Sequence, residues 1–566
     1  KVLYVNPRTG VVDLVMDPSD PNTLYATSWE RIRWKWNDPE NIASYTGSGV
    51  WKSTDGGAKW TQANQGLPDA QYRGRIGIDV ARSKPNVVYA FVDNYSIARK
   101  GQPGELDSYG NEIAGVIRGA TMFRSDDKGK NWRQVSDTNA FMMGAVNTFG
   151  WVFGNVRVDP TDENRVYFMG LSLNVSTDGG KTFARAGNNG GDNHALWIDP
   201  ENPYTIINGN DHGLGISYDR TATWRNFRSQ IGAVQFFNIA YDMATPFHVY
   251  GSVQDEGSRR CTVDLSGGRE YIPMAECEGA PGGEGSSHAT DWANPNIVYS
   301  SGQYGTLSRS EYGAPPDTSA AGRGGRGGRA NVGSPVIGKT CAPPPAPPPV
   351  QPGAAGRGAG GRGGDTTAAG RGAGGRGAGG AGGRAGAAGA LAGRGAAAAG
   401  RGGRGGGRGA GPVSTLIKPC ETVGDPRQRG NWVAPTIVSP HNPNVIYHGF
   451  QALYRSRDRG ATWTQISGDL SNNVKERIGR VPHQLIFTIS ESPVTPGIIY
   501  AGTDDGNVQV TRDYGKTWTN VASKLPQRLW VNKIAASAFD EGTVYVAQSG
   551  RYDDDFGVYL YKSTNY

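Results

Sequence analysis

The octapeptide S-R-D-R-G-A-T-W, Ser456–Trp463, is a short polar turn that ends in tryptophan, and the chain repeats it. Ser and Asp side chains accept hydrogen bonds from the N–H groups of a tight turn, and Gly supplies the backbone angle that other residues resist. The spacing therefore predicts a β-hairpin turn whose acid is already engaged and whose aromatic ring starts the next strand. The copies begin at Ser53, Ser125, Ser176, Ser456 and Thr511, and the copy at Ser217 lacks the Gly. Their acids, expected to be structural, are Asp55, Asp127, Asp178, Asp219, Asp458 and Asp513.

A second phrase precedes these turns, as in D-P-S-D-P-N-T-L-Y at Asp17–Tyr25 and S-P-H-N-P-N-V-I-Y at Ser439–Tyr447. Pro and Asn favour a turn, and the apolar residues that follow favour a strand. The two phrases together predict four antiparallel strands about every forty residues, which is the blade of a β-propeller. Nine units are predicted to begin near Val11, Gly74, Trp151, Asn193, Phe236, Ser286, Trp432, Gln484 and Asn532.

These phrases are Asp boxes, and the chain resembles bacterial secreted proteins of the sortilin-type Asp-box (BNR) propeller superfamily, often labelled glycosyl hydrolases. The resemblance also rests on D-N-H-A-L-W-I-D-P (Asp192–Pro200), V-Q-D-E-G-S (Val253–Ser258) and T-D-D-G-N-V-Q-V-T-R-D (Thr503–Asp513), and covers the chain outside residues 313–425. The family usually has Q-D-N-G and G-G-D-G where this chain has Glu256 and Glu284.

The resemblance implies an all-β protein containing parts of two tandem propellers, as in xyloglucanases, because nine blades exceed the usual ring. A single ten-bladed ring of the sortilin kind is the alternative. Residues 1–230 are expected to form four blades of the first propeller, and residues 231–312 and 413–566 to form blades of the second. Since the chain starts with Lys1 and stops within a repeated phrase, we expect an internal piece of a longer protein, with blades missing at both ends.

An arginine-glycine tract dominates the charge of the chain. Residues 318–412 hold twelve Arg and one Lys against a single Asp, so this segment is +12 and the rest of the chain is −5 of the total +7. The predicted propellers therefore lack the basic surface of a nucleic-acid binder. Residues 313–412 are predicted to be a disordered insertion on the bottom face. Contact with an acidic polymer is one role for it, and a neutral insertion is the alternative.

The four cysteines predict two disulfides in an oxidising compartment, because their spacing does not match a zinc site. Cys261–Cys277 and Cys341–Cys420 are the suggested pairs, and four unrelated buried thiols are the alternative. The sequence contains no apolar run of membrane-spanning length. We therefore expect a secreted, periplasmic or cell-surface protein without a membrane span, cofactor or bound metal. The oligomeric state is left open.

The top face, opposite the Asp boxes, is where function is expected. Blades one and two carry extra top-face residues, about 19 and 27, and functional loops concentrate in such insertions. The first contains W-E-R-I-R-W-K-W, in which Trp29, Trp34 and Trp36 could stack on sugar rings or a peptide. The alternative is that these rings pack against a neighbouring blade or the other propeller.

Other top-face loops are unusually polar. Asp211 with Asp255 or Glu256 is the predicted general acid and base of a glycosidase. Metal binding by Asp192, His194, Asp211 and His212 is a weaker alternative, and turn capping by Asp and Asn is the simplest one. No arginine cluster of the sialidase kind can be singled out from the sequence, and no motif supports protease or esterase chemistry. The remaining predicted ligand-binding residues are Gln254, Glu284, Gln303, Tyr304, Trp432, Asp504 and Asp505.

The sequence favours a recognition module that binds a glycan or peptide on its top face. The alternative is a hydrolase of a β-glucan or xyloglucan-like polysaccharide that uses paired top-face carboxylates.

Overall fold

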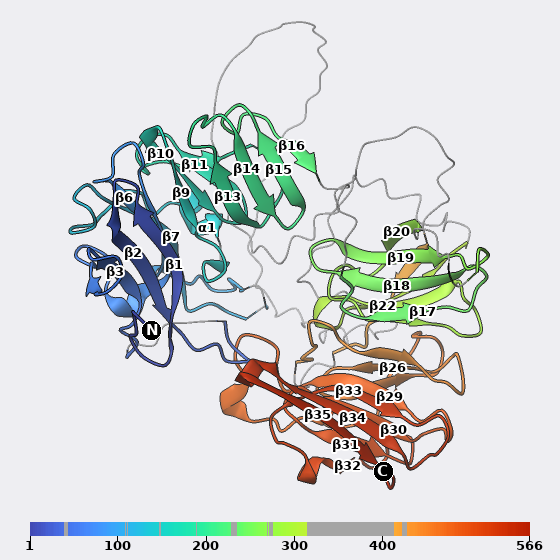
Figure 1. The fold of residues 1–566 in the computed structure, drawn as a ribbon. Coiled ribbons are helices and arrows are strands. Elements are labelled where there is room, and N and C mark those ends of the chain that lie inside the picture. The colour runs from blue at the N-terminus through green and yellow to red at the C-terminus, as the bar shows by residue number, and fades with distance from the viewer. Residues whose placement is uncertain are drawn as a thin grey trace, which may run out of the picture.

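The computed structural model describes residues 1–38, 44–107, 109, 111–146, 149–187, 189–227, 235–268, 270, 276–313, 412–421 and 427–566. In these residues the chain forms nine antiparallel sheets, eight of four strands and a last one of three. Each four-stranded sheet keeps its strands in chain order, so every unit is a β-meander (Figure 1). The predicted all-β fold of nine propeller blades is confirmed, except that the ninth blade has three strands.

Blades one to four form the first run. Their strands are β1 (Thr9–Asp17), β2 (Asp20–Glu30), β3 (Gly49–Ser53), β4 (Thr61–Gln62); β5 (Arg73–Val80), β6 (Val88–Lys100), β7 (Gly115–Ser125), β8 (Arg133–Gln134); β9 (Val156–Asp159), β10 (Asp162–Met169), β11 (Leu173–Ser176), β12 (Ala184–Arg185); β13 (Asn193–Ile198), β14 (Ile206–Asn210), β15 (Gly213–Ser217) and β16 (Arg225–Phe227). One short helix, α1 (Ala140–Ala145), precedes blade three.

Blades five to nine form the second run. Their strands are β17 (Ile239–Tyr241), β18 (Phe247–Val253), β19 (Gly257–Val263), β20 (Glu276–Ala280); β21 (His288–Thr290), β22 (Ile297–Ser301), β23 (Leu307–Glu311), β24 (Val413–Leu416); β25 (Thr436–Val438), β26 (Ile446–Gly449), β27 (Leu453–Ser456), β28 (Thr464–Gln465); β29 (Ile486–Glu491), β30 (Ile499–Thr503), β31 (Val508–Thr511), β32 (Thr519–Asn520); and β33 (Trp530–Ala536), β34 (Val544–Gly550), β35 (Asp555–Ser563).

The first strands of successive blades pack side by side in two series, β1-β5-β9-β13 and β17-β21-β25-β29-β33. Figure 1 shows the two runs as separate arcs, which fits parts of two tandem propellers. The predicted boundary at Gln230 lies outside the described residues. Exposed apolar side chains gather on the end blades, on faces that a neighbouring blade covers inside each run. They include Leu14 and Met16 on β1, Ile239 and Tyr241 on β17, and Phe556, Val558 and Leu560 on β35.

The Asp boxes form the hydrogen bonds that their spacing predicts. In the box at Ser456, the hydroxyl donates to Asp458 and accepts the N–H of Gly460, and Asp458 accepts the N–H of Thr462 at 2.7 Å. The other five boxes repeat this pattern at Asp55, Asp127, Asp178, Asp219 and Asp513. Their carboxylates are therefore used within the turns.

The box tryptophans also join neighbouring blades. The indole N–H of Trp463 donates to the carbonyl of Ile417, which follows the last strand of the preceding blade. Trp132, Trp224 and Trp518 make the equivalent bond to the preceding blade at 2.8–2.9 Å. Each of these four boxes thus closes its own hairpin and joins its blade to the preceding one, whereas Trp60 of the first box bonds to the carbonyl of Gly57 in its own turn.

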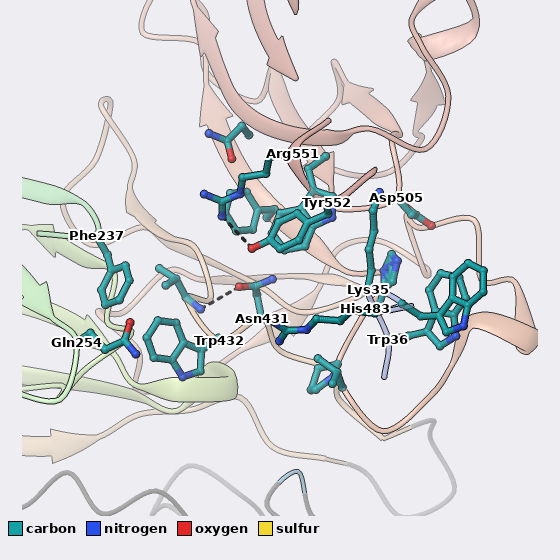
Figure 2. A pocket seen from close by; sticks show the side chains of 18 of the residues that line it. Lys35, Trp36, Phe237, Gln254, Asn431, Trp432, His483, Asp505, Arg551 and Tyr552 are labelled. Carbon is teal, nitrogen blue, oxygen red and sulfur yellow. Dashed lines mark hydrogen bonds between the residues drawn. The ribbon is translucent and has the colours of Figure 1, made fainter. Parts of the chain in front are cut away.

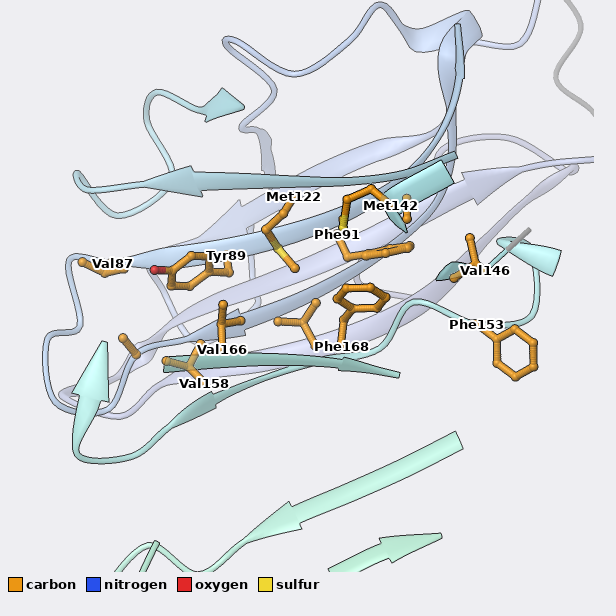
Figure 3. Packing of buried hydrophobic residues seen from close by; sticks show 13 residues of the cluster. Val87, Tyr89, Phe91, Met122, Met142, Val146, Phe153, Val158, Val166 and Phe168 are labelled. Atoms are coloured by element: carbon orange, nitrogen blue, oxygen red, sulfur yellow. The ribbon is translucent and has the colours of Figure 1, made fainter. Parts of the chain in front are cut away.

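Between the blades, the tyrosines that end the Pro-Asn phrase form a buried row, with large apolar side chains around them. Tyr89 is fully buried and its hydroxyl reaches the carbonyl of Glu163 in the next blade. Beside it, Phe91 of β6 packs on Phe168 of β10 with ring centroids 5.2 Å apart (Figure 3). The fully buried members of the row are Tyr25, Tyr89, Tyr167, Tyr250, Tyr299, Tyr447 and Tyr500.

The box without Gly gives a stability prediction. Thr221 occupies the Gly position with φ of 77°, within the range of 77–91° at the equivalent glycines of the other boxes. A β-branched residue is strained at such an angle, so Thr221→Gly is expected to raise the free energy of unfolding by about 0.5–1 kcal/mol. The reciprocal Gly57→Thr should lower it by at least as much. Urea unfolding of both variants tests this, and a destabilised Thr221→Gly would contradict it.

The arginine-glycine tract joins β23 to β24, the third and fourth strands of blade six. In the blades that have an Asp box, the box lies at this position, as the sequence indicates. Apart from Gly313 and Pro412, residues 313–412 lie outside the described residues, so the prediction of disorder there is not tested.

Cys261 and Cys277 form a disulfide across β19 and β20. Cys420 is also disulfide-bonded, but its suggested partner Cys341 lies outside the described residues.

Candidate active site

A cleft of about 1990 Å³ lies between the two runs of blades, and loops of both runs line it. Figure 2 shows Phe237, Gln254 and Trp432 on one side of it, and Trp36, His483, Arg551 and Tyr552 on the other. Nine residues that the sequence selected line this cleft: Trp29, Trp34, Trp36, Asp211, Gln254, Glu256, Tyr304, Trp432 and Asp505.

The blade-one insertion crosses from the first run to the second. Lys35 forms an ion pair with Asp553 at 2.7 Å and donates to the carbonyl of Arg528 at 2.8 Å. The carbonyl of Trp36 accepts the N–H of Val481 at 2.9 Å, and its ring packs on His483. Packing against the other propeller, one of the two roles considered for these rings, therefore applies to Trp36. The insertion ties the two walls of the cleft together.

Three carboxylates from two blades meet beside the cleft, and Asp211 is the one of them that lines it. Asp192 precedes β13, Asp211 follows β14, and Asp255 lies between β18 and β19. One oxygen of each lies within 4.8 Å of the other two. Asp192 and Asp255 have φ values of 55° and 58°, in the left-handed region that Asp tolerates better than most residues. Such left-handed positions are common in tight turns, where Asp is one of the preferred residues.

Polar groups from three blades surround the carboxylates. His194 Nε2 lies 3.0 Å from Asp211 Oδ1, and the nitrogen must be the donor because an ionised carboxylate only accepts. The N–H of Asp255 donates to Glu284 Oε2 at 2.7 Å. Gln303, in a short 3₁₀ turn at Gln303–Gly305, donates to the other oxygen of Glu284. The sequence-selected residues Asp192, His194, Asp211, Asp255, Glu284 and Gln303 thus form one network.

The environment drives the pKa values of the two central acids apart. Burial, a hydrogen bond with Asp211 and the negative charge of Glu284 raise the pKa of Asp255 to about 8. The hydrogen bond from His194 holds the pKa of Asp211 below its ordinary value. The same bond raises the pKa of His194, and burial raises that of Asp192. At neutral pH the site therefore holds a protonated Asp255 beside an ionised Asp211.

Glu256, the other predicted catalytic acid, lies outside the three-carboxylate cluster. It forms an ion pair with Arg259 at 3.3 Å, and His212 Nδ1 lies 3.5 Å from its other oxygen. Asp504 is fully buried and accepts the N–H of Leu485, which leaves it inaccessible to a ligand. Asp505 is 3% exposed and accepts the N–H of Asn472 and the hydroxyl of Thr503. Turn capping, the simplest reading of such acids, describes these two.

The three clustered carboxylates could also hold a hard divalent cation, which takes oxygen ligands of this type. The histidines of the predicted metal set are used elsewhere, because His194 bonds to Asp211 and His212 lies against Glu256. The sequence predicted a metal set of two Asp and two His. The structure instead offers three acids, Asp192, Asp211 and Asp255.

Several cleft residues escaped sequence reasoning. Arg31, Arg33, Arg477, Trp530 and Tyr552 all line the cleft. The first two lie in the quoted tryptophan-rich segment, so their position between Trp29 and Trp34 was the available signal. Arg477 precedes blade eight, and Trp530 and Tyr552 lie within blade nine, all in stretches without a distinctive motif.

Comparison with known proteins agrees with the repeat but adds little beyond it. The BNR-Asp box repeat family model matches residues 453–466, the turn around Ser456 in blade seven. No curated protein matches the chain in sequence. Likenesses to solved structures are weak, so they do not by themselves establish a shared fold or activity.

Three solved structures to which this chain is similar illustrate how low the identity and the TM-score are. The GH74 enzyme of Niastella koreensis is 14% identical, with a TM-score of 0.26, over 98% of this chain and 70% of that one. The GH74 xyloglucanase from Xanthomonas campestris is 13% identical, with a TM-score of 0.26, over 98% and 78%. YCF48 bound to the D1 peptide is 12% identical, with a TM-score of 0.25, over 55% and 84%.

The repeated hydrogen-bonded boxes and the nine sheets define the class: this is an Asp-box β-propeller protein. In the described residues no helix has the length and apolar character needed to cross a bilayer.

Proposed function

We propose that the protein is a glycoside hydrolase that binds a polysaccharide in the cleft and cleaves it with Asp255 and Asp211. The observation that carries the proposal is the pair of adjacent carboxyl groups with opposite pKa shifts. Such a pair provides a proton donor and an anion at the same pH, which is the requirement for cleaving a glycosidic bond.

In the proposed reaction Asp255 donates its proton to the glycosidic oxygen as the bond to the leaving sugar breaks. The Asp211 carboxylate attacks the anomeric carbon and forms a glycosyl ester. Water then attacks that carbon, Asp255 takes the proton of the water, and Asp211 is released as a carboxylate. Retaining enzymes hold their carboxyl groups about 5–5.5 Å apart. The oxygens here lie within 4.8 Å, nearer to that separation than to the roughly 6.5–9.5 Å of inverting enzymes, which favours retention over inversion.

The test is the stereochemistry of the product. Incubation with a panel of polysaccharides, including β-glucan, xyloglucan and polyuronates, is expected to release reducing ends from at least one of them. Proton NMR of the first product should show the anomeric configuration of the substrate. Inverted product would assign Asp211 to a base that activates water. The absence of new reducing ends across the panel would contradict hydrolysis.

A second candidate is recognition without cleavage, which the sequence favoured. The cleft wall supports it, because Trp34 is 45% exposed and Phe237 packs edge-on against Trp432, offering aromatic surface for a bound chain. Binding of an oligosaccharide or peptide that survives prolonged incubation unchanged would favour this candidate.

We also place the protein outside the cytoplasm, in the secreted, periplasmic or cell-surface space. The Cys261–Cys277 disulfide supports this placement, because such bonds persist mainly in oxidising compartments.

A further inference from the structure

Charge is distributed unevenly along the cleft. Two of the lining acids, Asp211 and Glu256, lie on blades four and five, where no lining residue is a cation. The lining cations lie on the N-terminal segment, the blade-one insertion and blades seven to nine, together with the acids Asp505, Asp553 and Asp554. Eight of the lining residues are Arg or Lys and five are Asp or Glu. Two of the cations are neutralised, since Arg8 pairs with Glu30 and Lys35 with Asp553. The cations that matter for a ligand are therefore those without such a partner.

Arg31 and Arg33 are exposed, and within the described part of the chain neither has a carboxylate at ion-pair distance. They lie two residues apart, on either side of Ile32. Each guanidinium lies over an indole ring, Arg31 over Trp29 at 4.9 Å and Arg33 over Trp151 at 4.7 Å. Both residues line the cleft.

The two guanidinium groups also repel each other. Partial burial and then the positive charge of Arg33 lower the pKa of Arg31, and the opposing attraction of Asp554 is smaller than both. A fold gains no stability from two like charges held together in this way. An anionic ligand would relieve the repulsion, because guanidinium groups bind carboxylates with paired, charge-assisted hydrogen bonds.

Aromatic surfaces alternate with these cations. Trp34 and Trp36 stack with centroids 5.3 Å apart and planes 15° apart, and Arg477 lies over Trp36 at 5.7 Å. On blade nine, Trp530 and Tyr552 pack at 4.5 Å, beside Arg551. Rings of this kind stack on the apolar faces of sugars, whereas a flexible acidic peptide would gain mainly from the charges. The combination therefore favours a sugar polymer that carries carboxylates.

We infer that the ligand of this cleft is an acidic polysaccharide, a polymer containing uronic acid residues, whose carboxylates bind Arg31 and Arg33. This inference rests on the proposed function and names its substrate class. It places the acidic sugars on the cationic wall and the scissile bond at Asp211 and Asp255, across the cleft. Neutral polymers can use the aromatic rings but leave the arginine pair without a counter-charge.

Binding by the hydrolytically inactive Asp255→Asn chain separates this inference from the proposed function, because binding does not require cleavage. The probes are oligomers of polygalacturonate, the same oligomers after reduction of their carboxyl groups, and xyloglucan oligomers. Calorimetry at low salt is expected to show at least about tenfold tighter binding of the carboxylated oligomer than of its reduced form. Raising NaCl should remove much of the difference, since salt screens exposed charges.

The variant Arg31→Gln/Arg33→Gln is expected to lose at least about tenfold in affinity for the carboxylated oligomer and little for the reduced one. The matched control, Arg82→Gln/Arg457→Gln, removes two exposed charges outside the cleft and should bind as the parent does. Because the arginine pair is self-repelling, its removal should not lower the melting temperature.

Three outcomes would overturn the inference. These are equal binding of carboxylated and reduced oligomers, unchanged binding in the Arg31/Arg33 variant, or an equal loss in the control. In each case hydrolysis of a neutral polymer by the unmodified chain would leave the proposed function standing. Conversely, selective binding of the acidic oligomer without any cleavage would support the inference and contradict the hydrolase.

Discussion

The variant Asp255→Asn is expected to lose about 10²–10⁴-fold in the rate of polysaccharide hydrolysis, the usual contribution of a positioned general acid. An amide cannot supply the proton that the departing sugar oxygen requires. The substitution is otherwise conservative, because Asn also accepts the left-handed backbone that residue 255 adopts at φ of 58°. Initial rates of reducing-end release, with the melting temperature as a check on folding, measure the effect.

Asp137→Asn, which changes an exposed acid outside the cleft, is the matched control for Asp255→Asn and should hydrolyse at the parental rate.

Asp211→Asn should lose as much activity as Asp255→Asn, because the nucleophile is then absent. The double variant should be scarcely slower than either single one, since the two groups act as a unit. Full activity in Asp255→Asn would show that the proton comes from another group. Activity lost on chelation and restored by Ca²⁺ would instead assign the three carboxylates to a metal.

The fold could be predicted from the sequence because its information is local and repeated. Each Asp box closes a hairpin with its own residues, and the tyrosine of the Pro-Asn phrase marks the buried strand, so nine units could be counted without any tertiary knowledge. The last sheet has three strands, and the given sequence ends at Tyr566, within the repeated phrase that precedes the fourth strand in other blades.

The candidate site was predictable only in part, for a physical reason. Polar residues such as Asp192, Asp211 and Asp255 could be assigned to the top face by strand counting. Which of them meet depends on how the fourth and fifth blades approach each other, and no local pattern encodes that. Glu256 illustrates the limit: it is adjacent to Asp255 in sequence, yet the turn directs it to His212 and Arg259. Arg31 and Arg33 belong to the quoted tryptophan-rich segment, but the sequence does not show that both line the cleft between the two runs.

The pH dependence of hydrolysis gives the second large effect, since kcat/KM should fall about tenfold for each pH unit above 8. The catalytic form needs Asp255 protonated and Asp211 ionised. Because the pKa of Asp255 is raised to about 8, the acid is lost as pH rises through that value. Because the pKa of Asp211 is lowered, the acidic limb should lie below the ordinary range of an aspartate. The profile is therefore broad and extends above neutrality.

Glu284→Gln tests the cause of the alkaline limb. Removing the negative charge beside Asp255 lowers its pKa, so the limb should move to lower pH by about one unit. The substituted amide can still accept the Asp255 N–H through its oxygen, and Gln303 can turn its own oxygen towards the new amide group. Glu256→Gln removes the charge of the residue next to Asp255 in sequence, which pairs with Arg259 and does not bond to Asp255. The alkaline limb of this variant should therefore stay near the parental pH. If both variants shift the limb equally, general surface charge rather than Glu284 sets the pKa of the acid. If neither shifts it, the alkaline limb belongs to a group other than Asp255.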